Sequence, residues 1–178
     1  MNIIFLDVDN VLNCDTSTSH CGQHTGVDND KIQRLKKIAD ETNAIIVLTS
    51  DWKIGYSPNI NECWPHAQYL VKHLKRYGLH ISDVTVDERP EFRGAGIKSW
   101  LKKVEDLPDI NYVILDDRLF DYEGEGLTSH LVWCNHKRGL GDIEMKQAID
   151  ILKNTLSQEE KDSMKMRKQY YGTNELFG

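Results

Sequence analysis

The chain has few of the features that mark secreted, membrane-bound or broadly nucleic-acid-binding proteins. No stretch approaches the roughly 18 consecutive apolar residues of a membrane span. The first apolar run is too short for a signal peptide and no basic region precedes it. The 22 Lys and Arg residues do not outnumber the 28 Asp and Glu residues, and the formal charge is −6. The sequence therefore predicts a soluble cytoplasmic protein without a membrane partner and without the positive charge that favours general nucleic-acid binding.

Cysteine is also scarce, and the four residues are irregularly spaced: Cys14, Cys21, Cys63 and Cys134. This spacing fits reduced thiols of a cytosolic protein better than a disulfide framework. A metal site in the loops remains the alternative, and its ligands would be drawn from Cys14, His20, Cys21, His24, Cys63 and His66. Cys63 and His66 have ligand-like spacing, but Cys14 and Cys21 do not match a common zinc module. We therefore interpret these residues as polar loop residues.

Short apolar runs alternate with helical patterns along the 178 residues. The runs at 3–6, 44–48, 112–115 and 131–133 are continuous, which is typical of strands buried on both faces of a parallel sheet. A further strand is predicted over 79–86, and apolar residues recur at helical spacing over 32–39, 64–77, 94–104 and 142–156. The pattern predicts one α/β domain in which helices cover both faces of a central parallel sheet.

We assign residues 1–156 to this domain and residues 157–178 to a charged C-terminal helical extension. Ser157 and Glu160 have the spacing of a helix capping box at its start. Aromatic residues close to the end of the chain indicate that the extension docks, either on the domain or on a second copy. Docking on a second copy would form a homodimer.

Polar residues follow three of the predicted strands: Asp7 and Asp9, then Thr49 and Ser50, then Asp116 and Asp117. Parallel strands bring their carboxyl ends to one edge of the sheet, where ligands bind in open α/β folds. Crowded carboxylates repel one another unless a cation neutralises them, and oxygen ligands favour Mg²⁺ over Zn²⁺. We therefore expect a magnesium site at this edge, with a hydroxyl and a basic side chain available to a phosphate oxygen. An Asp-rich turn that only caps the first strand is the alternative for Asp7 and Asp9.

This constellation resembles the haloacid dehalogenase (HAD) superfamily of phosphotransferases, in the variety that lacks a large cap domain. The first motif of the superfamily, Asp-x-Asp after a strand, matches Asp7 and Asp9. The second motif, a Thr or Ser that closes a strand, matches Thr49, with Ser50 as the competing reading. Many relatives have Gly where this chain has Asn10, and Asn tolerates the left-handed backbone of a tight turn. The resemblance spans roughly residues 1–155 and implies a HAD-like three-layer sandwich around a parallel sheet.

The third and fourth motifs each have two readings. The fourth motif is an acidic pair, which matches Asp116 and Asp117, or two Asp residues separated by three others, which matches Asp117 and Asp121. The third motif is a Lys or Arg before the last acidic strand. We favour Arg93, which stands at the start of a helix and can reach the site, over Lys98, which lies about a turn further along.

The resemblance implies a magnesium-dependent phosphatase, and it implies a role for each acid. Asp7 would attack phosphorus and form an aspartyl phosphate, while Asp9 would act as general acid and base. Mg²⁺ would be held by Asp7, the carbonyl of Asp9 and Asp116 or Asp117. The dehalogenase branch lacks the second acid, so Asp9 argues against dehalogenation.

The residues in and around the motifs are similar to those of phosphatase domains in RNA-repair proteins and polynucleotide kinase-phosphatases. This similarity implies a nucleotide or polynucleotide phosphate end as substrate. The segments 13–27 and 53–92 are too short for an independent cap domain, so we expect an open site, and Trp52 is placed to border its pocket. The alternatives are a phosphatase of phosphoproteins or small metabolites, and a non-catalytic binding module on the same fold.

Overall fold

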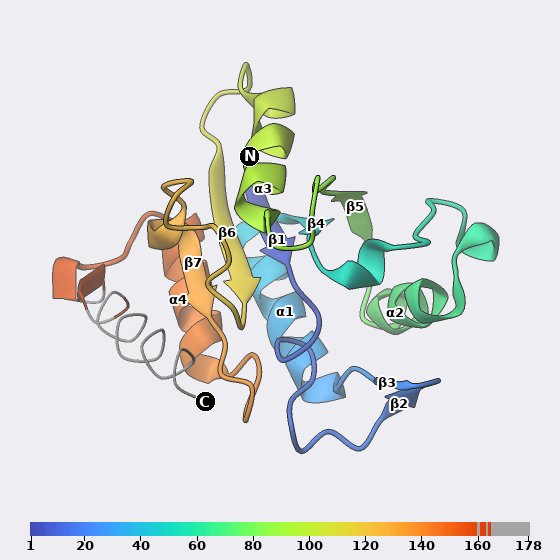
Figure 1. Cartoon of the computed structure of the whole chain (residues 1–178). Helices are drawn as coiled ribbons and strands as arrows, with labels where there is room; N and C mark the ends of the chain where they lie inside the picture. The colour runs from blue at the N-terminus through green and yellow to red at the C-terminus, as the bar shows by residue number, and fades with distance from the viewer. Residues whose placement is uncertain (160, 163, 165–178) are drawn as a thin grey trace.

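The computed structural model describes residues 1–159, 161, 162 and 164 as a three-layer α/β structure (Figure 1). The five strands of the central sheet are β1 (Asn2–Leu6), β4 (Ile45–Leu48), β5 (Ile81–Val84), β6 (Asn111–Asp116) and β7 (Leu131–Trp133). All of them are parallel, in the order β5-β4-β1-β6-β7. The chain builds outward from β1 on one side and then returns to add β6 and β7 on the other. The point where the strand order reverses, which is the usual ligand site of such sheets, therefore lies beside β1.

The register of the central strands aligns the predicted motifs. Leu6 of β1 pairs with Leu48 of β4 and with Leu115 of β6. The residues that follow these three leucines are Asp7, Thr49 and Asp116. Because the strands are parallel, these residues lie at the same edge of the sheet.

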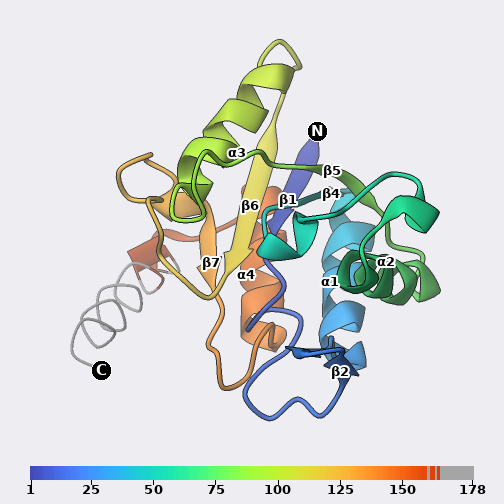
Figure 2. The ribbon, with the colours of Figure 1, turned by 45° about the vertical axis from the view of Figure 1, so that its right-hand side comes forward.

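Helices cover both faces of the sheet, as the continuous apolar runs predicted (Figures 1 and 2). The four helices are α1 (Asn29–Thr42), α2 (Pro65–Arg76), α3 (Arg93–Leu101) and α4 (Asp142–Leu152). Alternate residues of β1 divide between two hydrophobic cores: Ile4 and Leu6 pack with residues of α1, α2 and α4, whereas Ile3 and Phe5 pack with residues of α3. The sheet is therefore buried on both faces.

The segment between β1 and α1 contains a small element that the sequence did not predict. A two-stranded antiparallel hairpin forms from β2 (His20–Cys21) and β3 (His24–Thr25). It lies beside α2, where the Tyr69 hydroxyl accepts a 3.3 Å hydrogen bond from the Val27 amide. Neither this hairpin nor α2 forms a separate cap domain within the residues that the structure describes.

The remaining short elements are 3₁₀ helices: η1 (Asp51–Lys53), η2 (Ile60–Glu62), η3 (Lys102–Val104) and η4 (Thr128–His130). η3 replaces the last turn that was expected for α3. The helix α4 stops at Leu152 rather than near residue 156, and Asn154 just beyond it has left-handed backbone with φ of 55°. The sequence therefore predicted the elements better than their ends.

The C-terminal extension is described only in part. Residues 158, 159, 161, 162 and 164 are helical, and Met164 is buried against the α1–α4 core. Glu160 and the aromatic residues near the chain end lie outside the described residues. The boundary at residue 156 and the homodimer therefore remain predictions.

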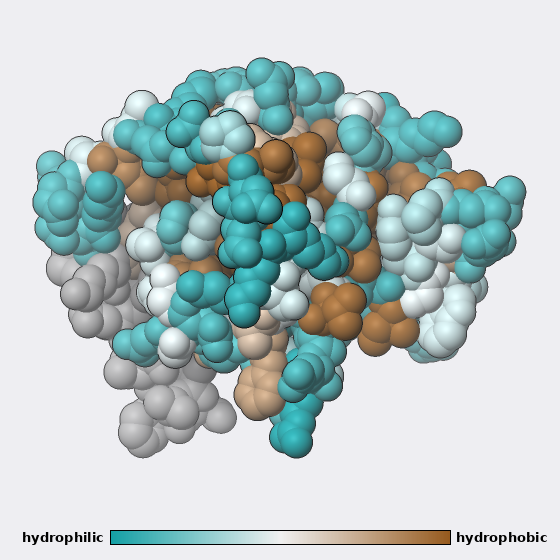
Figure 3. Space-filling model, turned by 90° about the horizontal axis from the view of Figure 1, so that it is seen from above, coloured by the Kyte–Doolittle hydropathy of each residue, from teal (hydrophilic) through white to brown (hydrophobic). Residues whose placement is uncertain are grey.

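Seen from the amino ends of the strands, the surface carries hydrophilic residues around most of its margin, with hydrophobic residues between them (Figure 3).

No helix in the described part of the chain is long and apolar enough to cross a membrane. All four cysteines have free thiols.

Candidate active site

Three carboxylates converge at the carboxyl edge of the sheet. Asp7 follows β1, Asp116 ends β6 and Asp117 comes directly after it. One oxygen of each carboxylate lies within 4.8 Å of the others. Asp7 and Asp116 are buried, and Asp117 is partly buried. Among the described residues, this is the one group of acidic, His or Cys side chains with three ligand atoms so close together.

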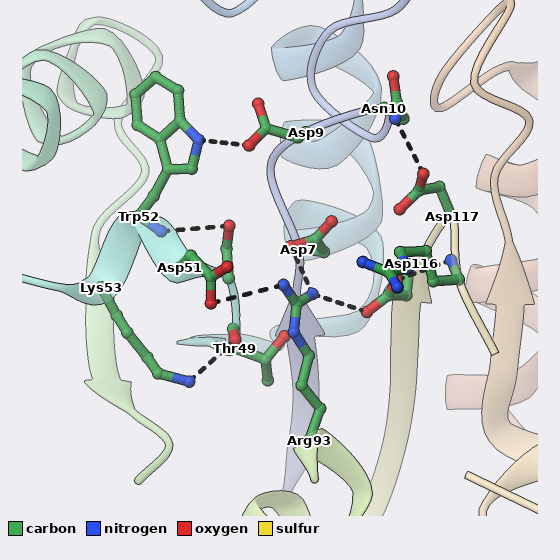
Figure 4. A network of polar contacts seen from close by, with 12 residues as sticks. Asp7, Asp9, Asn10, Thr49, Asp51, Trp52, Lys53, Arg93, Asp116 and Asp117 are labelled. Carbon is green, nitrogen blue, oxygen red and sulfur yellow. Dashed lines mark hydrogen bonds and ion pairs between the residues drawn. The ribbon is translucent and has the colours of Figure 1, made fainter. Parts of the chain in front are cut away.

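Arg93, the first residue of α3, supplies the positive charge at this cluster. Its Nη1 donates hydrogen bonds to Asp7 Oδ1 at 2.7 Å and to Asp116 Oδ2 at 3.1 Å (Figure 4). Its Nη2 lies 3.8 Å from Asp51 Oδ1. The guanidinium carbon sits 4.3 Å from the centre of the Phe120 ring, a cation–π contact. Arg93 therefore joins β1, β6 and η1 at one point.

The electrostatics of the cluster favour a second cation. Burial and then the Asp116 carboxylate raise the pKa of Asp7 well above its ordinary value, although Arg93 acts in the opposite direction. Burial raises the pKa of Asp116 to about 6, despite Arg93 and a hydrogen bond from the Arg118 amide. One guanidinium facing three carboxylates leaves an excess of negative charge. The three oxygen donors fit Mg²⁺, which prefers carboxylate ligands.

Asp9 is placed differently from the other acids. Its Oδ2 accepts a 2.9 Å hydrogen bond from Trp52 Nε1, and its Oδ1 accepts one of 3.1 Å from Asn13 Nδ2. Figure 4 shows the Asp9 carboxylate turned toward Trp52 and away from Asp7. The side chain of Asp9 is therefore outside the metal-ligand group, whereas the predicted contribution of its carbonyl stays a prediction.

Asn10 forms the tight turn expected after the first motif. Its backbone is left-handed, with φ of 58°, and its amide donates a 2.6 Å hydrogen bond to Asn13 Oδ1. Its side-chain amide donates to Asp117 Oδ2 at 2.9 Å. Asn10 thus preserves the turn and also holds one of the three clustered carboxylates, which a Gly cannot do.

Thr49 and Ser50 both reach the site, but only one hydroxyl is without a partner. The Oγ of Ser50 accepts a 3.4 Å hydrogen bond from the Trp52 amide, and its side chain also interacts with Asp7. Thr49 is fully buried and its Oγ1 has no hydrogen-bond partner. Arg93 Nε is likewise buried without a partner. A buried donor without a partner costs about 1–3 kcal/mol, and both atoms are available to donate to a ligand oxygen.

Residues 3–145 match the family described as the HAD domain in Swiss Army Knife RNA repair proteins. The chain belongs to this family. It is therefore a HAD-superfamily domain, and the superfamily assigns it to phosphatase-type hydrolases. No curated protein and no solved structure matches the chain.

Within this HAD domain, the two candidates for the third motif lie in different surroundings. Arg93 reaches the carboxylate cluster, whereas Lys98 is exposed on α3. Five residues along a helix correspond to a rotation of about 140°, so Lys98 projects from another side of α3. The structure brings Arg93 to the other motif residues and leaves Lys98 outside them. The phosphate-binding role of either residue remains a prediction.

Asp121, the second reading of the fourth motif, caps α3. Its Oδ1 accepts a 2.6 Å hydrogen bond from the Gly94 amide, and its Oδ2 accepts one of 3.0 Å from the Ala95 amide. A Cβ at Gly94 would lie 2.8 Å from Asp121 Oδ1, so glycine permits this close approach. Asp121 therefore orients the helix end that carries Arg93.

Three supporting residues were not predicted from the sequence. Lys53 Nζ donates to the Thr49 carbonyl at 3.0 Å and also binds Asp87, so it ties η1 to the end of β4. The Tyr122 hydroxyl donates a 2.7 Å hydrogen bond to Asp116 Oδ2. The sequence held one sign of these contacts: Lys53 lies four residues after Thr49, close enough along the chain for its side chain to reach back to the Thr49 carbonyl. Asp87 and Tyr122 belong to loops whose paths the sequence pattern does not predict.

The loop cysteines and histidines considered as metal ligands form no compact ligand group in the described ranges. His24 and His66 instead face each other as rings, with centroids 5.8 Å apart.

Mg²⁺ is expected to stabilise the protein against heat at pH 7.5. At 100 times its Kd, a ligand specific for the folded state adds about 2.7 kcal/mol, or about 5–11 °C at 2–4 °C per kcal/mol. Asp117→Asn should reduce the shift, and exposed Asp106→Asn should not. Calorimetry with and without chelator measures it. An equal shift in the two variants would exclude this cluster as the metal site.

The same scans at several pH values test the raised pKa values of Asp7 and Asp116. The unfolded chain loses these protons near pH 4, whereas the folded protein keeps them to higher pH, about 6 for Asp116. Their contribution to metal-free stability is therefore fully present below pH 4; the part due to Asp116 is lost as the pH rises through about 6, and the part due to Asp7 is lost as the pH rises through its own raised pKa. Mg²⁺ should accordingly stabilise more at pH 7.5 than at pH 5.

Asp121→Ala is expected to lower the free energy of unfolding by about 1 kcal/mol, the usual cost of a lost helix N-cap. Asp121→Asn keeps one acceptor and should lose less. Urea denaturation measures both, with Asp106→Ala as the exposed control. Equal stability of Asp121→Ala and the control would show that the cap does not hold α3.

Proposed function

We propose that this HAD domain is a magnesium-dependent phosphomonoesterase that forms an aspartyl phosphate on Asp7. The observation that supports this most strongly is the pair of buried donors without partners: Thr49 Oγ1, on the residue that follows β4, and Nε of Arg93, whose Nη1 binds Asp7 (Figure 4). A phosphate monoester carries several anionic oxygens that can accept from both donors. It also presents an electrophilic phosphorus to a carboxylate nucleophile.

In the first step, an oxygen of Asp7 attacks phosphorus and the bond from phosphorus to the ester oxygen breaks. The leaving oxygen departs on the side opposite Asp7, because the attacking and leaving oxygens are roughly in line. Asp9 gives its proton to that oxygen. Arg93, which already contacts Asp7, offsets charge on the transferring group.

In the second step, water attacks the phosphorus of the aspartyl phosphate and passes a proton to Asp9. The bond between Asp7 and phosphorus breaks, and inorganic phosphate leaves. Asp9 thus acts first as acid and then as base. Its hydrogen bonds from Trp52 and Asn13 hold its carboxylate near the leaving-group side.

Asp7, Asp116 and Asp117, together with the Asp9 carbonyl, would hold the magnesium ion. When bound, Mg²⁺ offsets the repulsion between the carboxylates and the substrate phosphate and stabilises charge in the transition state.

A nucleotide or a polynucleotide phosphate end is the substrate class that we propose. The family takes its description from RNA repair proteins. The edge near the site is formed by a short hairpin and α2 rather than by a cap domain, which leaves room for a polymer end. The net charge of −6 disfavours long contacts with a nucleic-acid backbone, so recognition centres on the end itself.

Purified protein is expected to release phosphate in the presence of Mg²⁺, and most efficiently from nucleotides or phosphorylated oligonucleotides. The panel should contain 5′- and 3′-phosphorylated forms, an aryl phosphate, a phosphopeptide and a small sugar phosphate. Asp7→Asn should lower kcat by at least about 10³-fold, as expected for loss of a nucleophile, with Asp106→Asn as control.

The outcomes of this panel separate the alternatives. A phosphopeptide or a sugar phosphate as best substrate would replace the proposed substrate class and retain the mechanism. Turnover that survives Asp7→Asn would overturn the aspartyl-phosphate mechanism. Magnesium binding without turnover of any substrate would indicate a binding module.

Trp52→Phe is expected to lower kcat by about tenfold, which is part of the 10²–10⁴-fold that a general acid contributes. The change removes the hydrogen bond to Asp9 and keeps a ring at this position. The deficit should be smaller with an aryl phosphate, whose leaving group needs little protonation. Trp100→Phe is the matched control, because it removes an indole hydrogen bond to Asp83, away from the site. Equal deficits on both substrates would argue against Asp9 as the acid.

A further inference from the structure

A chain of four aromatic side chains begins at Trp52, whose Nε1 donates to Asp9, and we call these side chains the aromatic platform: His24, Trp52, Trp64 and His66. They come from separate segments, namely β3, η1, the residue before α2 and α2 itself. The ring centroids of His24, Trp52 and His66 are 5.8–5.9 Å apart in each pair. Trp64 extends the group, with its ring 6.2 Å from that of His66. These distances are typical of rings in contact.

The rings at the outer end of the platform are held in place by the backbone. A ring nitrogen of His66, Nε2, is 2.8 Å from the Ile54 carbonyl, so it carries the proton. The Trp64 amide donates a 2.8 Å hydrogen bond to the Gly55 carbonyl. Gly55 has φ of +74°, and a Cβ there would overlap the Trp64 ring, so the indole rests directly on the glycine backbone. This arrangement fixes Trp64 without covering it.

The platform connects the buried site with the surface. Trp52 is only 3% exposed, and its Nε1 binds Asp9 at 2.9 Å. His24 is exposed, and Trp64 is 57% exposed, which is unusual for so large an apolar ring. The platform therefore runs from the catalytic acid outward to solvent.

The direction of the proposed reaction indicates which part of the substrate lies against the platform. The ester oxygen leaves opposite Asp7 and takes its proton from Asp9. The part of the substrate that remains after dephosphorylation must therefore lie on the Asp9 side. Trp52 contacts Asp9 on that side, and the other three rings continue from Trp52.

We propose that the aromatic platform stacks a heterocyclic base of the substrate, in the nucleotide next to the phosphate that binds at Asp7. This inference rests on the proposed function and narrows it to an unpaired end, because a base can stack on protein rings only when its face is available. Stacking tolerates any base, since each has a π-face. Rings rather than cations supply the contact, which agrees with the acidic net charge.

The test compares two substrates that differ only in one base. One is a short single-stranded oligonucleotide with a terminal phosphate, and the other is the same oligonucleotide with an abasic residue at that end. The ratio of kcat/KM for the first to that for the second should exceed ten in the unaltered protein. Trp64→Ala should lower this ratio by about tenfold, equivalent to about 1.4 kcal/mol, mainly through KM. Trp64→Phe should restore most of it.

Two control variants leave the platform intact. His80→Ala removes an exposed imidazole immediately before β5, and Leu107→Ala removes an exposed apolar side chain before β6. Both residues precede their strands and therefore lie toward the amino edge of the sheet, opposite the site. Both should keep the ratio of the unaltered protein, whereas His66→Ala should lower it. A ratio near one, or an equal loss in the controls and in Trp64→Ala, would overturn the platform.

Binding to Asp7→Asn, measured by fluorescence anisotropy with both oligonucleotides, separates this inference from the proposed function. Hydrolysis at the same rate with and without the terminal base would contradict base stacking on the platform and would support the proposed phosphatase activity. If the unaltered protein hydrolyses neither oligonucleotide, but binding depends on the base and Trp64→Ala abolishes this dependence, base stacking would be supported and the phosphatase activity contradicted. If the protein shows no hydrolysis and no base-dependent binding, both proposals are contradicted.

Discussion

The bridge from Arg93 to Asp7 and Asp116 is the interaction on which the site depends. All three side chains are buried, and a buried charge that loses its partner is strongly destabilising. The bridge forms only when β1 and β6 are in register and α3 begins at Arg93. The parallel sheet, the cap from Asp121 and the contact with Phe120 all support that geometry.

The site has two parts with different physical properties. The inner part holds three crowded carboxylates and one guanidinium, with raised carboxyl pKa values that favour cation binding. The outer part begins at Asp9, whose carboxylate is held by Trp52 and Asn13 rather than by Arg93. This separation suits a reaction in which one acid attacks phosphorus and the other exchanges protons with the leaving group and water.

Much of the fold could be predicted, because a strand that is buried on both faces of a sheet appears in the sequence as a continuous apolar run. The runs at 3–6, 112–115 and 131–133 lie within β1, β6 and β7, and the polar residues after them meet at one edge. The hairpin of β2 and β3 was missed, because its four residues alternate too briefly to give a period. The ends of α3 and α4 were misplaced, since a single left-handed residue or a 3₁₀ turn leaves no periodic signal.

The sequence by itself determined the parallel sheet, the family motifs and the expectation that Asp7, Thr49 and Asp116 meet at one edge, because continuous apolar runs indicate buried parallel strands and such strands end at the same edge of a sheet. The strand order and register came from the tertiary structure. Only the tertiary structure decided that Arg93 rather than Lys98 reaches the cluster, that Asp121 caps α3, and that Tyr122 and Lys53 support the site. It also decided that the rings of His24 and His66 lie next to Trp52, whose Nε1 binds Asp9. The physical reason is that these contacts depend on side-chain direction and on how loops pack, and spacing along the chain specifies neither.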